Sequence, residues 1–139
     1  MNNLNIGAVA LATIAQFVVG AIWYMPLFGK LWGDIHGFNK LSKAEQTAAR
    51  AKMMPLLGVQ FAVTILISVV LAKFVAVLPD YSPYALAVMA WVGFVVPAQV
   101  SAVVFGGTEP RWIVKKTAVM AGGSLACLLV AAAILGAMR

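Results

Sequence analysis

The chain has 139 residues, of which 63% are hydrophobic and only 10% are charged. This composition excludes an ordinary water-soluble globule and indicates an integral membrane protein. Ten lysines and arginines against four acidic residues leave a formal net charge of +6, which in a soluble protein would suggest nucleic acid as a partner.

Four runs with few or no charges are each long enough to cross roughly 30 Å of hydrocarbon as a helix. The ten-residue alternating pattern of barrel strands is absent from the sequence, so the predicted fold is all-α. The first run has no basic region before it, and we expect a retained span rather than a cleaved signal. We predict an integral membrane four-helix bundle forming one transmembrane domain over residues 1–139, with spans at about 4–28, 53–78, 84–105 and 117–138.

The first span ends in the most distinctive stretch of the chain, WYMPLFGKLWG at residues 23–33. Trp and Tyr prefer the headgroup level, and Pro26 disrupts the last turn of the helix. Gly29 is expected to take the left-handed conformation that caps a helix, with Lys30 near the negative end of the helix dipole. The candidate interfacial motif consists of Trp23, Tyr24, Pro26, Phe28, Gly29, Lys30, Trp32 and, from the third loop, Trp112.

The first loop contains a helix start of its own. Ser42 followed by Glu45 is a capping box, and the alanines after it favour helix. We expect a short cytoplasmic helix between spans one and two that starts near Lys43 and runs into span two, where Pro55 would bend or restart it at the membrane surface.

The end of the third span resembles the end of the first. Pro97, Phe105-Gly106, Arg111 and Trp112 repeat the order proline, Phe-Gly, basic residue, tryptophan, although with different spacing. Two hairpins related by an axis along the membrane normal would produce such a pattern, and so would chance.

The basic residues predict the orientation of the chain. Eight of the ten fall in loops one and three, and only Lys73 and Arg139 fall toward the other side. By the positive-inside rule, these two loops are expected to lie in the cytoplasm and both termini outside. The positive net charge then mostly indicates which loops face the cytoplasm, so it no longer suggests nucleic acid as a partner. We expect the basic loops to contact membrane lipid instead.

Taken together, these motifs resemble domain-of-unknown-function family 1761, small four-helix membrane proteins found mainly in bacteria. The resemblance rests on G-x-x-WY-x-P-x-FGK-x-W at residues 20–32, on the capped helix, and on W-x-GF-x-x-P at 91–97 with Phe105-Gly106. It implies the four-span fold and no established activity, so it assigns no catalytic residue.

The predicted spans contain no Asp, Glu or His. Small drug exporters need a membrane-embedded Glu, and membrane glutathione-type transferases need paired acidic and Arg residues inside the bundle. Small fluoride channels need a weak charge bias, whereas the bias here is strong. Two neighbouring candidate ligands, Asp34 and His36, are too few for a metal site, and Cys127 has no base beside it. We therefore expect no enzymatic activity, no cofactor and no metal.

The remaining intramembrane chemistry is a candidate polar cluster of Gln16, Gln60 and Gln99. These residues either line a cavity or make interhelical hydrogen bonds that fix helix register. Stripes of small residues, such as Ala8, Ala12 and Gly20, serve either the bundle or a subunit interface, and a homo-oligomer is expected. The first functional hypothesis is a structural or interaction protein, and the alternative is a small solute or ion carrier or channel.

Overall fold

The computed structural model describes residues 4–139, which are helical over nearly their whole length. The predicted all-α fold is confirmed, and four helical stretches are long and apolar enough to cross a membrane: Ile6–Leu27, Lys43–Val77, Pro83–Phe105 and Pro110–Ala137. The chain is therefore a multi-pass membrane protein.

Each stretch is built from one or more regular elements. The first comprises α1 (Ile6–Ile22) and a π-helical turn (Trp23–Leu27), and α2 (Gly29–Ile35) follows it. After a 3-10 turn (Phe38–Lys40) comes α3 (Lys43–Val77). The third stretch comprises α4 (Pro83–Ala90), a π-helical turn (Trp91–Val95) and α5 (Val96–Phe105). The fourth stretch comprises a 3-10 turn (Pro110–Trp112) and α6 (Ile113–Ala137).

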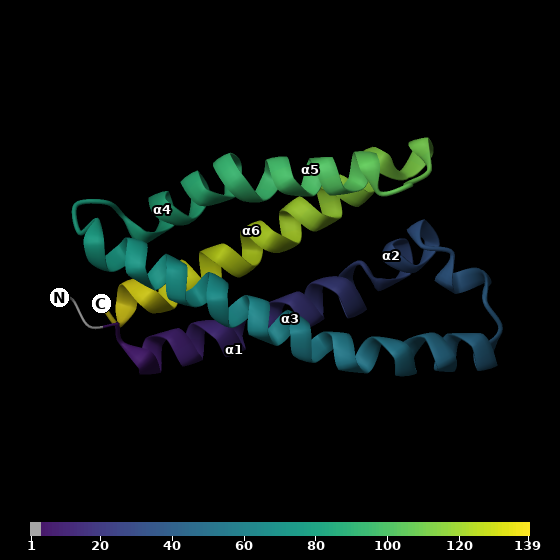
Figure 1. The fold of residues 1–139 in the computed structure, drawn as a ribbon, viewed down its shortest axis with the longest axis horizontal. Coiled ribbons are helices and arrows are strands. Elements are labelled where there is room, and N and C mark those ends of the chain that lie inside the picture. Colours follow the sequence, from purple (N-terminus) through teal and green to yellow (C-terminus); the bar gives the residue numbers. More distant parts are fainter. Residues whose placement is uncertain (1–3) are drawn as a thin grey trace.

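The two ends of the bundle differ in charge. The termini and the short 78–82 connection lie at one end, which we call the terminal end (Figure 1). Residues 28–42 and 106–112 lie at the other, which we call the basic end. Because neighbouring helices run antiparallel, these two loops, which lie some seventy residues apart in the chain, come together at the same end of the bundle.

Helix α6 forms the centre of the bundle and packs against α1, α4 and α5, while α3 crosses α1. The main cluster of buried apolar residues lies in the terminal half, where small residues such as Ala12, Ala87 and Ala131 are fully buried and let the helices approach closely. Val103 and Val119 are buried nearer the basic end. Toward the basic end α3 moves away from the other helices (Figure 1), and residues 51–63 are all exposed.

The capping box at the start of α3 is present as predicted. Ser42 Oγ accepts from the Glu45 N–H at 3.2 Å, and the Glu45 carboxylate accepts from the Ser42 N–H. The separate short helix expected after it is not confirmed, because α3 runs without a break from Lys43 through Pro55 to Val77. A proline inside a membrane helix removes one hydrogen bond without ending the helix when the neighbouring turns keep theirs. The short helix of the first loop is instead α2.

Two π-helical turns widen the first and third spans at corresponding points. The Phe28 N–H donates to the Trp23 carbonyl, and the Val96 N–H donates to the Trp91 carbonyl, so each turn begins at a tryptophan. Pro26 lies within the first turn and Pro97 follows the second, and a proline leaves the carbonyl four residues earlier without its helical donor. The likeness between spans one and three therefore centres on the two tryptophans rather than on the Phe-Gly pairs.

Candidate functional site

The indole of Trp23 attaches the first span to the central helix. Its Nε1–H donates to the Val119 carbonyl at 2.9 Å. The ring lies directly over two glycines of α6: a Cβ added at Gly122 would meet Trp23 Cζ2 at 2.7 Å, and one added at Gly123 would meet Cδ1 at 2.9 Å. Any larger residue at these two positions would displace the ring. Trp91 is held to α6 in the same way, because its Nε1–H donates to the Ala121 carbonyl at 2.9 Å.

The rest of the first motif packs its aromatic rings against one another. Trp23 and Phe28 have ring centroids 4.8 Å apart, and Tyr24 lies edge-on to Trp32 at 4.9 Å. Trp32 also contacts the imidazole of His36 at 4.4 Å. The motif thus forms two aromatic groups, one that packs against α6 through Trp23 and one that extends along α2 to His36.

Gly29 does not cap the first span in a left-handed conformation, so that expectation is wrong. It begins α2, and the glycines with positive φ among the described residues are Gly37 and Gly107. The structure gives a different reason for glycine at position 29: an added Cβ would lie 3.2 Å from the Tyr24 carbonyl oxygen, because the π-helical turn brings the chain close to itself. Lys30, one residue later, is exposed on α2.

Asn39 holds α2 against the rest of the first loop. Its Nδ2 amide donates to the Lys30 carbonyl at 2.9 Å and to Asp34 Oδ1 at 2.7 Å. The side chain fits because position 33 is glycine, where an added Cβ would lie 2.6 Å from Asn39 Oδ1. This small network fixes the part of the first loop that faces the third loop.

Basic side chains lie over aromatic rings at the basic end. Arg111 and Lys115 lie 5.0 and 5.4 Å from the centroid of Trp112. Lys116 lies 5.9 Å from the centroid of Trp32, which links α6 to the first motif. Arg50 of α3 lies 5.3 Å from the centroid of Phe38. We call these seven residues the basic collar: Trp32, Phe38, Arg50, Arg111, Trp112, Lys115 and Lys116.

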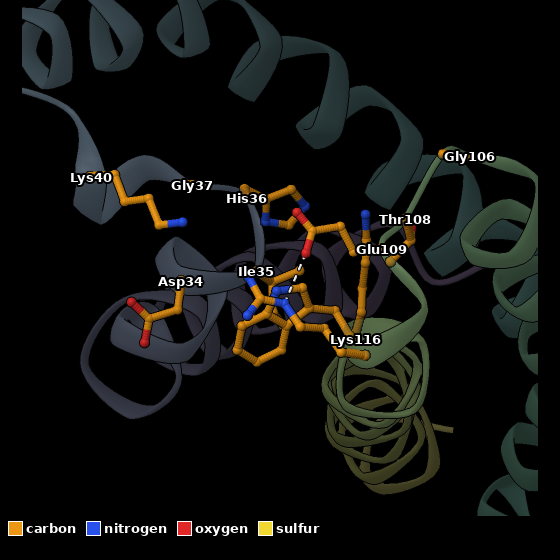
Figure 2. Close-up of a pocket in the computed structure, with 12 residues that line it drawn as sticks. Asp34, Ile35, His36, Gly37, Lys40, Gly106, Thr108, Glu109 and Lys116 are labelled. Atoms are coloured by element: carbon orange, nitrogen blue, oxygen red, sulfur yellow. Dashed lines mark hydrogen bonds and ion pairs between the residues drawn. The ribbon is translucent and has the colours of Figure 1, made fainter.

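A cavity of about 280 Å³ lies between the two loops that carry the collar. Residues 34–37 and Lys40 line it from the first loop, and residues 106–109, Arg111, Trp112 and Lys116 line it from the third (Figure 2). Glu109 Oε2 pairs with Arg111 Nε at 2.8 Å. The cavity is thus the place where the structure brings the charged groups of both loops together.

The three glutamines of the candidate polar cluster do not meet. Gln16 is 3% exposed, and its Nε2 amide donates to Ser68 Oγ of α3 at 2.7 Å. Thr13 Oγ1 lies 2.9 Å from the same hydroxyl, which in turn donates to the Thr64 carbonyl at 3.0 Å. Gln16 therefore belongs to a buried polar group between α1 and α3.

Gln99 takes part in a second group between α5 and α6. Its Nε2 amide donates to the Met120 carbonyl at 3.3 Å, and its Oε1 accepts from the Ser124 hydroxyl at 3.3 Å. Gln60 lies apart from both: its side chain is exposed on α3 and makes no hydrogen bond to any described residue. The structure thus separates the three residues that the sequence suggested as one cluster.

Two residues that shape the site were not identified from the sequence. One is Gly123, which receives Trp23 together with Gly122, a member of the small-residue stripe that the sequence predicts on the fourth span. The other is Thr108, whose hydroxyl is buried at the cavity and has no hydrogen-bond partner among the described residues. No sequence pattern distinguishes it.

The comparison with known families agrees with the fold. The family model described as protein of unknown function, DUF1761, matches residues 7–136. The chain belongs to this family. The match extends from the first turn of α1 to the last turn of α6, so the DUF1761 protein includes both loops and the cavity between them. No curated protein and no solved structure matches the chain.

Proposed function

We propose that this DUF1761 protein is a non-enzymatic interaction protein of the bacterial cytoplasmic membrane whose basic collar contacts anionic lipid headgroups. Both termini then lie outside and the basic end lies in the cytoplasm, since eight of the ten basic residues belong to that side. The observation that carries the proposal is the collar itself. Arginine and lysine held over aromatic rings at a helix end match the polarity of the headgroup region, and each basic residue near an anionic surface contributes about 1 kcal/mol.

The polar groups inside the bundle support this function over the carrier alternative. Gln16 and Gln99 lie in two different helix interfaces and have hydrogen-bond partners there. Interhelical contacts of this kind contribute about 0.6 kcal/mol on average and fix how the helices pack. A carrier would need polar groups that converge on one solute path, and these three glutamines do not converge.

Lipid composition around the protein tests the proposal. In nanodiscs of phosphatidylcholine with a minor fraction of phosphatidylglycerol, we expect phosphatidylglycerol to be enriched among the lipids that remain bound in native mass spectrometry. Changing the collar residues Arg50 and Lys115, which do not line the cavity, together to glutamine should abolish most of this enrichment, because about 2 kcal/mol of attraction is removed. The matched control is Lys73→Gln, which removes a charge near the terminal end of α3. Equal enrichment in the double variant and the control would contradict the proposal.

We further propose that the protein acts as a homo-oligomer in which the basic half of α3 contacts a second copy. Ser68 hydrogen-bonds to α1, Thr64 is buried one turn earlier, and Gln60 continues their stripe by one more turn. There Phe61, whose ring packs against Phe17, still contacts α1, and the Gln60 side chain is exposed. Gln60 lies seven residues, or about 10 Å, past the start of the apolar run at Met53. An amide without a partner at that depth costs roughly 2 to 7 kcal/mol. A second copy related by a two-fold axis supplies an identical amide, which is both donor and acceptor.

A further inference from the structure

The cavity between the two loops at the basic end has unpaired hydrogen-bond donors on both of its sides. Among the described residues Arg111–Glu109 is the one ion pair, and the carboxylate of Asp34 accepts from the Asn39 amide. Both carboxylates at the cavity thus have partners, while the ammonium groups of Lys40 and Lys116 have no hydrogen-bond or ion-pair partner within residues 4–139. Lys116 extends toward Thr108, as Figure 2 shows.

Thr108 gives an independent indication of a ligand. Its Oγ1 atom is buried and has no hydrogen-bond partner, the only side-chain atom of this kind among the described residues. Buried hydroxyl groups nearly always have a partner, because leaving one unsatisfied costs about 1 to 3 kcal/mol. Thr108 lines the cavity beside the end of the Lys116 side chain (Figure 2), so a ligand that enters between them would supply the acceptor that the hydroxyl lacks.

The charge and the backbone of the cavity both favour an anion. Three cationic side chains, Lys40, Arg111 and Lys116, face two carboxylates, which leaves one positive charge. The cavity also lies at the N-terminal end of α6, a helix of 25 residues whose dipole adds positive potential there. A singly charged tetrahedral anion has enough acceptor oxygens for the lysines and the hydroxyl together.

We propose that this cavity binds a phosphate group, held by Thr108 of the third loop and Lys116 of α6, with Lys40 contributing positive charge from the first loop on the opposite side. The volume of about 280 Å³ is at the lower limit of small-ligand sites, which suits a phosphate with a small substituent rather than a large metabolite. Two sources have this chemistry, the headgroup of an anionic lipid and a phosphate dissolved in the cytoplasm. The inference deepens the proposed function and rests on it for the side of the membrane that the cavity faces.

Equilibrium binding with two probes tests the site. The full-length protein in a zwitterionic detergent is titrated with dihexanoyl phosphatidic acid and, separately, with inorganic phosphate. We expect saturable binding of at least one probe. Lys116→Gln should weaken it about tenfold or more, because a charge-assisted hydrogen bond is lost. Thr108→Val, which keeps the shape of the side chain, should also weaken it several-fold while the thermal stability of the unliganded protein is kept or raised. Lys73→Gln is the control and should leave binding unchanged.

The outcomes separate the sources and decide the inference. Binding of the lipid probe alone identifies a headgroup site, and binding of inorganic phosphate identifies a site for dissolved phosphate; each supports the cavity if Lys116→Gln and Thr108→Val weaken it. Absence of saturable binding of both probes would overturn the inference, and so would equal weakening by Lys73→Gln. If these titrations fail while phosphatidylglycerol enrichment persists in nanodiscs, the cavity site is refuted and the proposed function stands. Loss of enrichment with intact saturable binding would instead refute the proposed function and support the cavity site.

Discussion

Replacing Gly123 by valine is expected to lower the free energy of unfolding by about 1 to 3 kcal/mol. An added Cβ would lie 2.9 Å from Trp23 Cδ1 and 3.0 Å from Nε1, so the indole has to move. Movement of the ring also weakens its hydrogen bond to the Val119 carbonyl. Valine is a better helix former than glycine by only a few tenths of a kcal/mol, so the steric clash outweighs this gain and the change lowers the free energy of unfolding. Reversible unfolding in mixed micelles, followed by circular dichroism, measures the effect.

A double-mutant cycle separates this contact from a general intolerance of valine in α6. Trp23→Leu in the Gly123→Val background should recover part of the lost stability, because the smaller side chain leaves room for the new methyl groups. Gly58→Val is the control for valine inside a regular helix, since a Cβ at Gly58 of α3 meets nothing within 4 Å. Additive effects of the two changes, with no coupling between them, would show that Trp23 does not lie against Gly123.

The second large effect is expected on self-association. Changing Gln60 to leucine should weaken the association of two copies in liposomes by about 3- to 16-fold, if the amide contributes between 0.6 and 1.7 kcal/mol as interhelical polar contacts do. Within one copy the side chain is exposed and has no partner among the described residues, so the change should leave the fold of the monomer intact. Energy transfer between labelled copies at several protein-to-lipid ratios gives the association constant.

Val59→Leu is the control for this measurement, because it alters an exposed neighbour on α3 without removing a polar group. Unchanged or tighter association of Gln60→Leu would contradict the two-fold contact. The amide would then face lipid or a solvated opening of the single chain.

The sequence predicted those parts of the fold that depend on local physics. Uncharged runs of sufficient length identified the four helices, and Ser42 with Glu45 identified the start of α3. The sequence also indicated that this helix runs into span two, but it predicted a separate short helix ending at Pro55, because the local effect of proline does not show that the turns on both sides of it remain hydrogen-bonded. The role of Gly29 was also missed, since its close approach to the Tyr24 carbonyl exists only once the π-helical turn has formed.

The candidate site was predictable in composition but not in arrangement. The aromatic and basic residues of both loops stand out in the sequence, yet nothing in it states that Lys116 lies over Trp32 or that Trp23 lies over Gly122 and Gly123. The same holds for the glutamines. All three are polar residues in apolar runs, but Gln16 and Gln99 face different neighbours and Gln60 is exposed, so spacing along the chain carries no information about their separation.

Cysteine labelling of intact spheroplasts tests the central claim most directly, which is that the basic end of this four-span bundle faces the cytoplasm. In a Cys127→Ala background, Lys40→Cys reports on the basic end and Ser82→Cys on the terminal end, and both positions are exposed. A membrane-impermeant maleimide should label the cysteine at position 82 in intact spheroplasts and the cysteine at position 40 only after permeabilisation. Labelling at position 40 from outside, with position 82 protected, would contradict the orientation and the lipid contact that depends on it.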